Sequence, residues 1–158
     1  MAIITWESRE LALPDANGSI YASFFDAVAS GAASEVLINR VLAPNPDALL
    51  PGQTSGPILG QVWDPLIDYS TFLPDAGVDV LVVRLGASID IPLPPLGSLL
   101  CNPLAPGKSF VGAPGSPIML PLPLDCTLIG IPLCAQGLSA NASLTLFTNA
   151  LEVTLGTL

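Results

Sequence analysis

Residues 117–137 read Pro-Ile-Met-Leu-Pro-Leu-Pro-Leu-Asp-Cys-Thr-Leu-Ile-Gly-Ile-Pro-Leu-Cys-Ala-Gln-Gly. The stretch is apolar, contains four prolines and carries two of the three cysteines of the chain. Leu120, Leu122 and Leu124 alternate with prolines, and a proline has no N–H group to donate to a β-ladder. The pattern therefore predicts an edge strand, or a polyproline-like segment that lies across a sheet. An apolar edge needs a cover, which is either a loop of the same chain or a strand of a neighbouring subunit.

The same pattern of short apolar runs and turn residues continues through the rest of the chain. The runs are rich in β-branched residues, and Gly, Pro, Asn and Asp separate them. Residues 78–85 are the clearest buried strand of the first half of the chain, and Arg84 within it should reach solvent or meet a carboxylate because burying an unpaired cation is costly. We expect about eight to eleven short strands in one all-β domain, residues 1–158, with an antiparallel β-sandwich or jelly-roll-like core. The strand at residues 3–6 is expected to be detached and to engage a neighbouring subunit.

The composition favours association between copies of the chain. Hydrophobic residues make up 51% of the 158 positions and charged residues 11%, against a usual charged share of about 25%. No apolar run reaches the ~18 residues that a membrane-spanning helix needs. A chain with so little charge must bury apolar surface in a large core or against copies of itself. The expected partners are therefore copies of the same chain, in a homo-oligomer or polymer.

The charged residues limit the function classes. Thirteen Asp and Glu against four Lys and Arg give a net charge of −9, which disfavours nucleic acids and anionic membranes as partners. The chain has no histidine, which removes the Ser-His and Cys-His pairs of nucleophilic catalysis. Asp64 with Asp68, and Asp75 with Asp79, are formal carboxylate pairs, but turn aspartates are the simpler interpretation. We therefore expect no enzyme activity and no cofactor.

Two polar motifs are candidates for a ligand or a modification. Asp15, Asn17 and Ser19 alternate in a turn that contains glycine, which is typical of either an Asx turn or the start of a calcium-binding loop. The glutamate that completes an EF-hand is absent downstream. Asn17 and Asn141 each begin an Asn-x-Ser sequence, the acceptor for N-glycosylation, which indicates a surface loop.

Part of the chain resembles a known kind of domain. Residues 92–97 read Pro-Leu-Pro-Pro-Leu-Gly, residues 125–137 contain Leu-Ile-Gly and Ala-Gln, and residues 148–156 contain Asn-Ala-Leu-Glu. With the strand ending at Leu85, these pieces make residues 78–157 similar to a β-rich C-terminal domain of large secreted or cell-surface proteins of planctomycete-type bacteria. The resemblance implies a β-sandwich-like architecture outside the cell and a modular or assembly role, and it implies no catalytic activity.

In that extracellular setting the three cysteines predict one disulfide and one spare thiol. We expect the bridge between Cys101 and Cys126, because both lie at strand or loop edges and the loop that it closes is long. A bridge between Cys126 and Cys134 is the second choice, since it requires the chain to turn at Gly130. With the first choice, Cys134 is left as a buried core residue or an intermolecular thiol. The alternative is three reduced cysteines in a cytosolic protein.

Together, these features predict a non-enzymatic structural protein at the cell surface or outside the cell. It would assemble into a filament, tube or surface layer through apolar faces and strand edges. The alternative is a β-sandwich module that binds carbohydrate or a cell-surface partner, with Trp63, Tyr69 and Phe72 as its stacking platform. The candidate assembly edge consists of Ile3, Ile4, Trp6, Leu120, Leu122 and Leu124.

Overall fold

The computed structural model describes residues 31–158. This part of the chain contains eleven β-strands, two 3-10 helices and no α-helix. The strands are β1 (Ser34–Ile38), β2 (Leu49–Leu50), β3 (Val62–Trp63), β4 (Leu66–Ile67), β5 (Val78–Leu85), β6 (Ser88–Leu93), β7 (Gly97–Cys101), β8 (Gly107–Gly112), β9 (Leu120–Pro121), β10 (Pro132–Ala140) and β11 (Thr145–Thr154). The 3-10 helices are η1 (Tyr69–Thr71) and η2 (Cys126–Leu128). Within the described range, no helix has the length and apolar character to cross a membrane. The predicted all-β fold class is confirmed.

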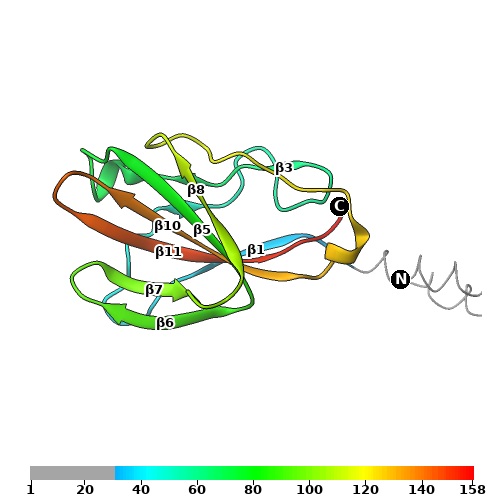
Figure 1. The fold of residues 1–158 in the computed structure, drawn as a ribbon, viewed down its shortest axis with the longest axis horizontal. Helices are drawn as coiled ribbons and strands as arrows, with labels where there is room; N and C mark the ends of the chain where they lie inside the picture. The colour runs from blue at the N-terminus through cyan, green and yellow to red at the C-terminus, as the bar shows by residue number, and fades with distance from the viewer. Residues whose placement is uncertain (1–30) are drawn as a thin grey trace, which may run out of the picture. The chain divides into compact units, whose positions relative to one another are not determined.

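Five strands form the central sheet, in the order β1-β11-β10-β5-β8, with every neighbouring pair antiparallel (Figure 1). The predicted strand at 78–85 is β5, whose valines and leucines fit a pleated sheet surface. Successive side chains of a strand point to opposite faces. Val83 and its partner Ala135 therefore lie on one face, and Arg84 and its partner Cys134 lie on the other. The two faces have different covers.

An apolar layer made of the short ladders β2–β4 and β3–β9 covers the face that carries Val83 and Ala135. Trp63 is the largest side chain in this layer and is 1% exposed. Its indole N–H donates to Glu35 Oε1 at 2.8 Å, so burial of the ring leaves no unpaired donor. Burying one Leu or Ile side chain stabilises a fold by roughly 1.5–3 kcal/mol. The buried cluster consists of Leu49, Trp63, Ile67, Leu81, Ile118, Leu120, Ala135, Leu151 and Val153.

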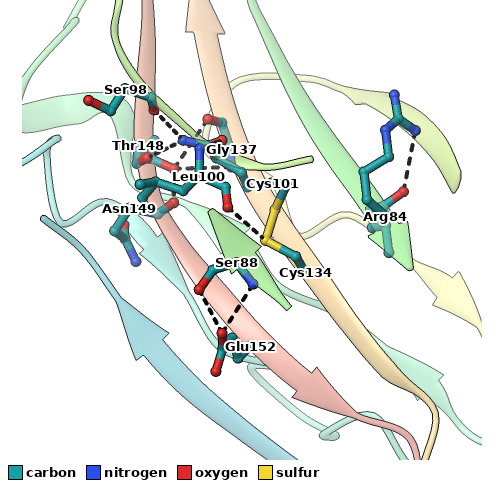
Figure 2. The surroundings of a disulfide bond; sticks show 12 residues. Arg84, Ser88, Ser98, Leu100, Cys101, Cys134, Gly137, Thr148, Asn149 and Glu152 are labelled. Atoms are coloured by element: carbon teal, nitrogen blue, oxygen red, sulfur yellow. Dashed lines mark hydrogen bonds between the residues drawn. A yellow bond between two sulfur atoms is a disulfide. The ribbon is translucent and has the colours of Figure 1, made fainter. Parts of the chain in front are cut away.

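The β6–β7 hairpin covers the opposite face of the sheet (Figure 1). A small buried cluster lies beneath it, formed by Leu100, Cys101, Cys134 and Ala150. A disulfide joins Cys101 of β7 to Cys134 of β10, with the two Cα atoms 5.5 Å apart (Figure 2). The hairpin is therefore tied covalently to the middle of the sheet.

A β-bulge changes the course of β11 at its centre. Between the pairs Gln136–Ala150 and Leu138–Phe147, the single residue Gly137 lies opposite two residues of β11. A bulge of this kind redirects the side chains of the longer strand. The polar side chains at this point can therefore turn to neighbouring segments, which places them in the network described below.

Candidate assembly surface

A groove of 420 Å³ lies between the end of the central sheet and the β3–β9 ladder. Three strands of the sheet form one wall and β9 with the residue after it forms the other. The wall is largely apolar, and its main side chains are Val83, Leu85, Phe110, Leu120, Leu122 and Leu133. Leu85 is 45% exposed although it lines the groove. The sandwich is thus open on this side.

The edge strand β8 borders the groove and leaves main-chain groups unpaired. Among the described strands it pairs with β5 alone. The Leu85 N–H donates to the Pro106 carbonyl at 2.9 Å, and antiparallel pairs alternate between bonded and non-bonded positions. The register then turns the N–H and C=O groups of Ser109 and Val111 away from β5. These groups form a free edge that can accept another strand.

Two cations lie at the same end of the edge. Arg40 pairs with Asp90 at 2.9 Å, which leaves Arg84 and Lys108 without a carboxylate partner in residues 31–158. They occupy neighbouring positions, since Lys108 pairs with the residue that precedes Arg84, and both contribute to the wall of the groove. Lys108 is exposed, and the buried Nε of Arg84 has no hydrogen-bond partner. Of the two predicted outcomes for Arg84, contact with solvent or with a carboxylate, the first applies, since Arg84 is half-buried and has no carboxylate partner among the described residues.

The leucines of the predicted edge have three different environments. Leu120 is 6% exposed and pairs with Trp63 in the β3–β9 ladder. The Leu122 N–H donates to the Gln61 carbonyl at 2.9 Å, and the Gly60 N–H donates to the Leu122 carbonyl at 3.1 Å. A segment of the same chain therefore covers this edge, which decides between the two covers that the sequence left open. The prediction of Leu120 as an exposed assembly residue is wrong, because its side chain belongs to the core, whereas Leu124 is 80% exposed.

The predicted Cys101–Cys126 bridge is also wrong. Cys101 bonds to Cys134, and Cys126 is an exposed free thiol on η2. The reason is that β7 packs over β10, which brings Cys101 and Cys134 together on the hairpin side of the sheet. Cys126 lies instead in a surface turn capped by Asp125, whose carboxylate accepts from the Thr127 N–H at 2.9 Å.

A network of buried amides between the sheet and β7 escaped prediction. Gln136 accepts from the Leu100 N–H at 2.8 Å and donates to the carbonyls of Ser98 and Thr148 at 2.8 and 2.9 Å. Asn45 donates to the same two carbonyls and accepts from the Ser98 N–H, each at 2.8 Å. The side-chain amides thus provide the bonds that a ladder would have made. The signal for this network in the sequence was a polar glutamine within an otherwise apolar run. In the structure Gln136 lies in β10 and is 1% exposed.

The predicted stacking platform does not form an exposed surface. Trp63 is buried in the core, Phe72 packs against the same cluster, and Tyr69 is half-buried beside Gly115. A sugar-stacking ring must be open to the ligand, whereas β9 pairs with β3 and covers Trp63. Trp63 is therefore corrected from a ligand platform to a core residue.

The carboxylates of the first formal pair, Asp64 and Asp68, stabilise a loop and a turn. The Asp64 side chain accepts from Thr54 and from the Ser55 N–H. Burial raises the pKa of Asp64, but the hydrogen bonds from Thr54 and Ser55 outweigh it, so the pKa is lowered. Asp68 caps η1. No cluster of three or more potential metal ligands occurs within residues 31–158.

The buried Asp79 also has a structural role. Its carboxylate accepts from the Ser139 hydroxyl at 2.5 Å and from the Gly115 N–H at 2.9 Å. These bonds connect β5 to β10 and to the loop after β8. Asp75, the other member of that formal pair, is exposed. The interpretation of Asp79 as a turn aspartate is wrong, because it lies within β5 and its side chain is buried.

Several predicted residues lie outside the described part of the chain. These are the calcium candidates Asp15, Asn17 and Ser19 and the assembly residues Ile3, Ile4 and Trp6, which stay predictions. Asn141 lies in the turn between β10 and β11, where its Oδ1 accepts from the Ser143 and Leu144 N–H groups at 2.8 and 2.7 Å. Glycosylation at Asn141 stays a prediction.

Comparisons with protein-family models, with curated proteins and with solved structures gave no match to this chain. The fold and the groove therefore define its class without a relative. It is an all-β protein whose central antiparallel sheet is sealed on one face and open beside β8 on the other.

Proposed function

We propose that this chain is a non-enzymatic structural protein that assembles with copies of itself outside the cell. The observation that carries the proposal is the open apolar groove beside the free edge of β8. An unpaired strand edge next to an apolar surface is an association site unless another element covers it. The low charged fraction of the chain favours the same kind of contact.

The position of the groove favours an open-ended assembly. β8 is at one edge of the central sheet and β1 is at the other. A contact that joins the β8 edge of one copy to a different part of the next is heterologous, and such contacts build filaments unless the rotation between copies closes a ring. The proposed product is therefore a filament, tube or layer.

One observation supports the location of the proposed assembly. A disulfide such as Cys101–Cys134 is typical of proteins in an oxidising compartment. The location expected from the sequence resemblance of residues 78–157 is the same compartment. We therefore place the assembly at the cell surface or in the extracellular space.

The proposal is tested with purified full-length chain by sedimentation velocity and negative-stain electron microscopy. We expect wild-type species far larger than the 16.2 kDa monomer. L85K should shift the population to monomer, because it places a charge in the groove at a residue that is already 45% exposed. L42K is the matched control, since Leu42 is 78% exposed and does not line the groove.

The possible outcomes separate assembly from the surface that drives it. A wild-type chain that stays monomeric at millimolar concentration overturns the proposed function. Assembly that survives L85K but is lost in L42K places the contact near the β1–β2 connection and overturns the role of the groove. Circular dichroism and thermal unfolding establish that both variants are folded.

A further inference from the structure

We infer that the groove beside β8 takes residues 3–7 of a second copy as an added strand. This inference rests on the proposed self-assembly and names the segment that performs it. The segment reads Ile-Ile-Thr-Trp-Glu, and it belongs to the part of the chain before Gly31. Three properties of the groove fit it, namely its main-chain edge, its apolar wall and its charge.

The main-chain edge can bind a strand without rearrangement. Ser109 and Val111 turn their N–H and C=O groups outward, and no described strand pairs with them. β8 belongs to the central sheet and β9 to the layer that covers it, with the groove between them. A strand added along β8 would extend the sheet and close the open side of the sandwich.

The side chains of the segment match the apolar wall. In a strand, Ile4 and Trp6 point to the same side, because side chains alternate with a period of two. That side would face Phe110 and Leu122, which line the groove. A tryptophan is an effective anchor for such a groove, because large aromatic side chains contribute most to the affinity of protein interfaces.

The charges of the two surfaces are complementary. Glu7 directly follows Trp6, and Glu10 lies three residues further along, with Arg9 between them, so that residues 7–10 carry one net negative charge. Lys108, which shares the groove face with Val83, lies at one end of the groove, and Arg84, whose side chain is on the hairpin face of β5, borders the same end. Neither cation has a carboxylate partner in the described residues. Opposite charges placed in this way orient an incoming segment and raise its association rate.

The chain is long enough for one copy to reach the next. Residues 8–33 separate the segment from β1 and span up to roughly 85 Å when extended. The distance across five strands of a sheet is only roughly 19 Å. Because β1 and β8 are at opposite edges, a segment that leaves one copy before β1 and binds β8 of the next repeats head to tail.

The experiment uses two full-length variants, each defective at one end of the contact. I4D/W6D removes the donor, because two carboxylates replace the apolar anchors. S109P removes the acceptor, because proline has no N–H group and is tolerated in an edge strand whose N–H faces outward. We expect each variant alone to be monomeric. An equimolar mixture should form a dimer of twice the 16.2 kDa mass, since S109P still donates and I4D/W6D still accepts.

Matched controls test the chemistry of each end. S109A keeps the N–H group and should assemble like the wild type. L11D/L13D makes the same apolar-to-acidic change just after the segment and should also assemble. We expect I4D/W6D to raise the concentration needed for assembly by at least about tenfold, which can be measured as a shift in the onset of light scattering.

A synthetic peptide of residues 2–10 gives a second readout that holds even if S109P fails to fold. The peptide should cap wild-type assemblies and lower their mean mass, and the same peptide with Asp at positions 4 and 6 should not. Assembly of I4D/W6D at the wild-type concentration overturns the inference and leaves the proposed function intact. A mixture that stays monomeric, with both variants folded, overturns the exchange between copies, and a monomeric wild type overturns the proposed function itself.

Discussion

The two faces of the central sheet are covered in different ways. On one face the β6–β7 hairpin is tied down by the Cys101–Cys134 disulfide and by the hydrogen bonds of Gln136. A further tie is the Glu152 carboxylate, which accepts from the Ser88 hydroxyl and N–H at 2.6 and 3.1 Å (Figure 2). On the other face, the β3–β9 layer is held mainly by apolar packing, with the Trp63–Glu35 hydrogen bond as a tie to β1, and leaves a groove beside β8.

The difference separates stability from association. Directional bonds fix the hairpin in one position, and a buried polar group without its partner would cost about 1–3 kcal/mol. Apolar contact is non-directional and can be extended by any apolar surface of suitable shape. The sealed face therefore specifies the fold, and the open face can accept a further segment. Changes on the sealed face should reduce stability, and changes at the groove should reduce assembly.

Removal of the disulfide should have the largest effect on stability. The bridge closes a loop with a sequence separation of 33, for which the loop-entropy model gives about 3–4 kcal/mol. We expect C101S/C134S to lose that amount in urea unfolding at pH 7. C126S, which changes the exposed free thiol, should stay within about 0.5 kcal/mol of the wild type. Peptide mapping that finds Cys101 bonded to Cys126 would contradict the covalent tie between the hairpin and the central sheet.

Gln136 tests the polar part of the sealed face. Q136L leaves the Leu100 N–H without its acceptor, whereas the Ser98 and Thr148 carbonyls keep their bonds from Asn45. We expect a loss of about 1–3 kcal/mol in the free energy of unfolding. The matched control is Q53L, because the exposed Gln53 side chain donates to the Pro51 carbonyl and makes no other hydrogen bond among the described residues. Equal stability of Q136L and the wild type would show that apolar packing alone holds the hairpin.

The sequence predicted the fold class because its signals are local. Prolines and glycines at the ends of β-branched runs mark short strands wherever they occur, and residues 78–85 became β5. The errors concern contacts between distant segments. Nothing near Cys101 or Cys134 indicates that β7 packs over β10, and nothing near Trp63 indicates that β9 closes over it. The groove could not be predicted from the sequence for the same reason, because its walls come from separate segments of the chain.

The smallest expected effect is the dependence of the hairpin tie on pH. Hydrogen bonds from the Ser88 hydroxyl and N–H lower the pKa of Glu152 below its ordinary value of 4.5, against the opposing effect of burial. The folded state thus favours the ionised form, so its contribution is complete above pH 4.5 and is lost as the pH falls through the folded pKa. We expect E152Q to cost about 1 kcal/mol at pH 7 and to weaken the acid-induced loss of stability.

Thermal unfolding of the wild type and E152Q between pH 7 and pH 2.5 checks this dependence. D75N is the control, since Asp75 is exposed and no hydrogen bond of its side chain is found among the described residues. Because Asp64 also has a lowered pKa, on the apolar side of the sheet, E152Q should retain part of the loss. The stabilities of the wild type and E152Q should therefore converge as the pH falls. Protonation of Glu152 in the wild type removes the ionised hydrogen-bond acceptor that E152Q already lacks. Parallel curves would mean that Glu152 does not tie the hairpin through its charge, and the sealed face would then depend on the disulfide and the amides alone.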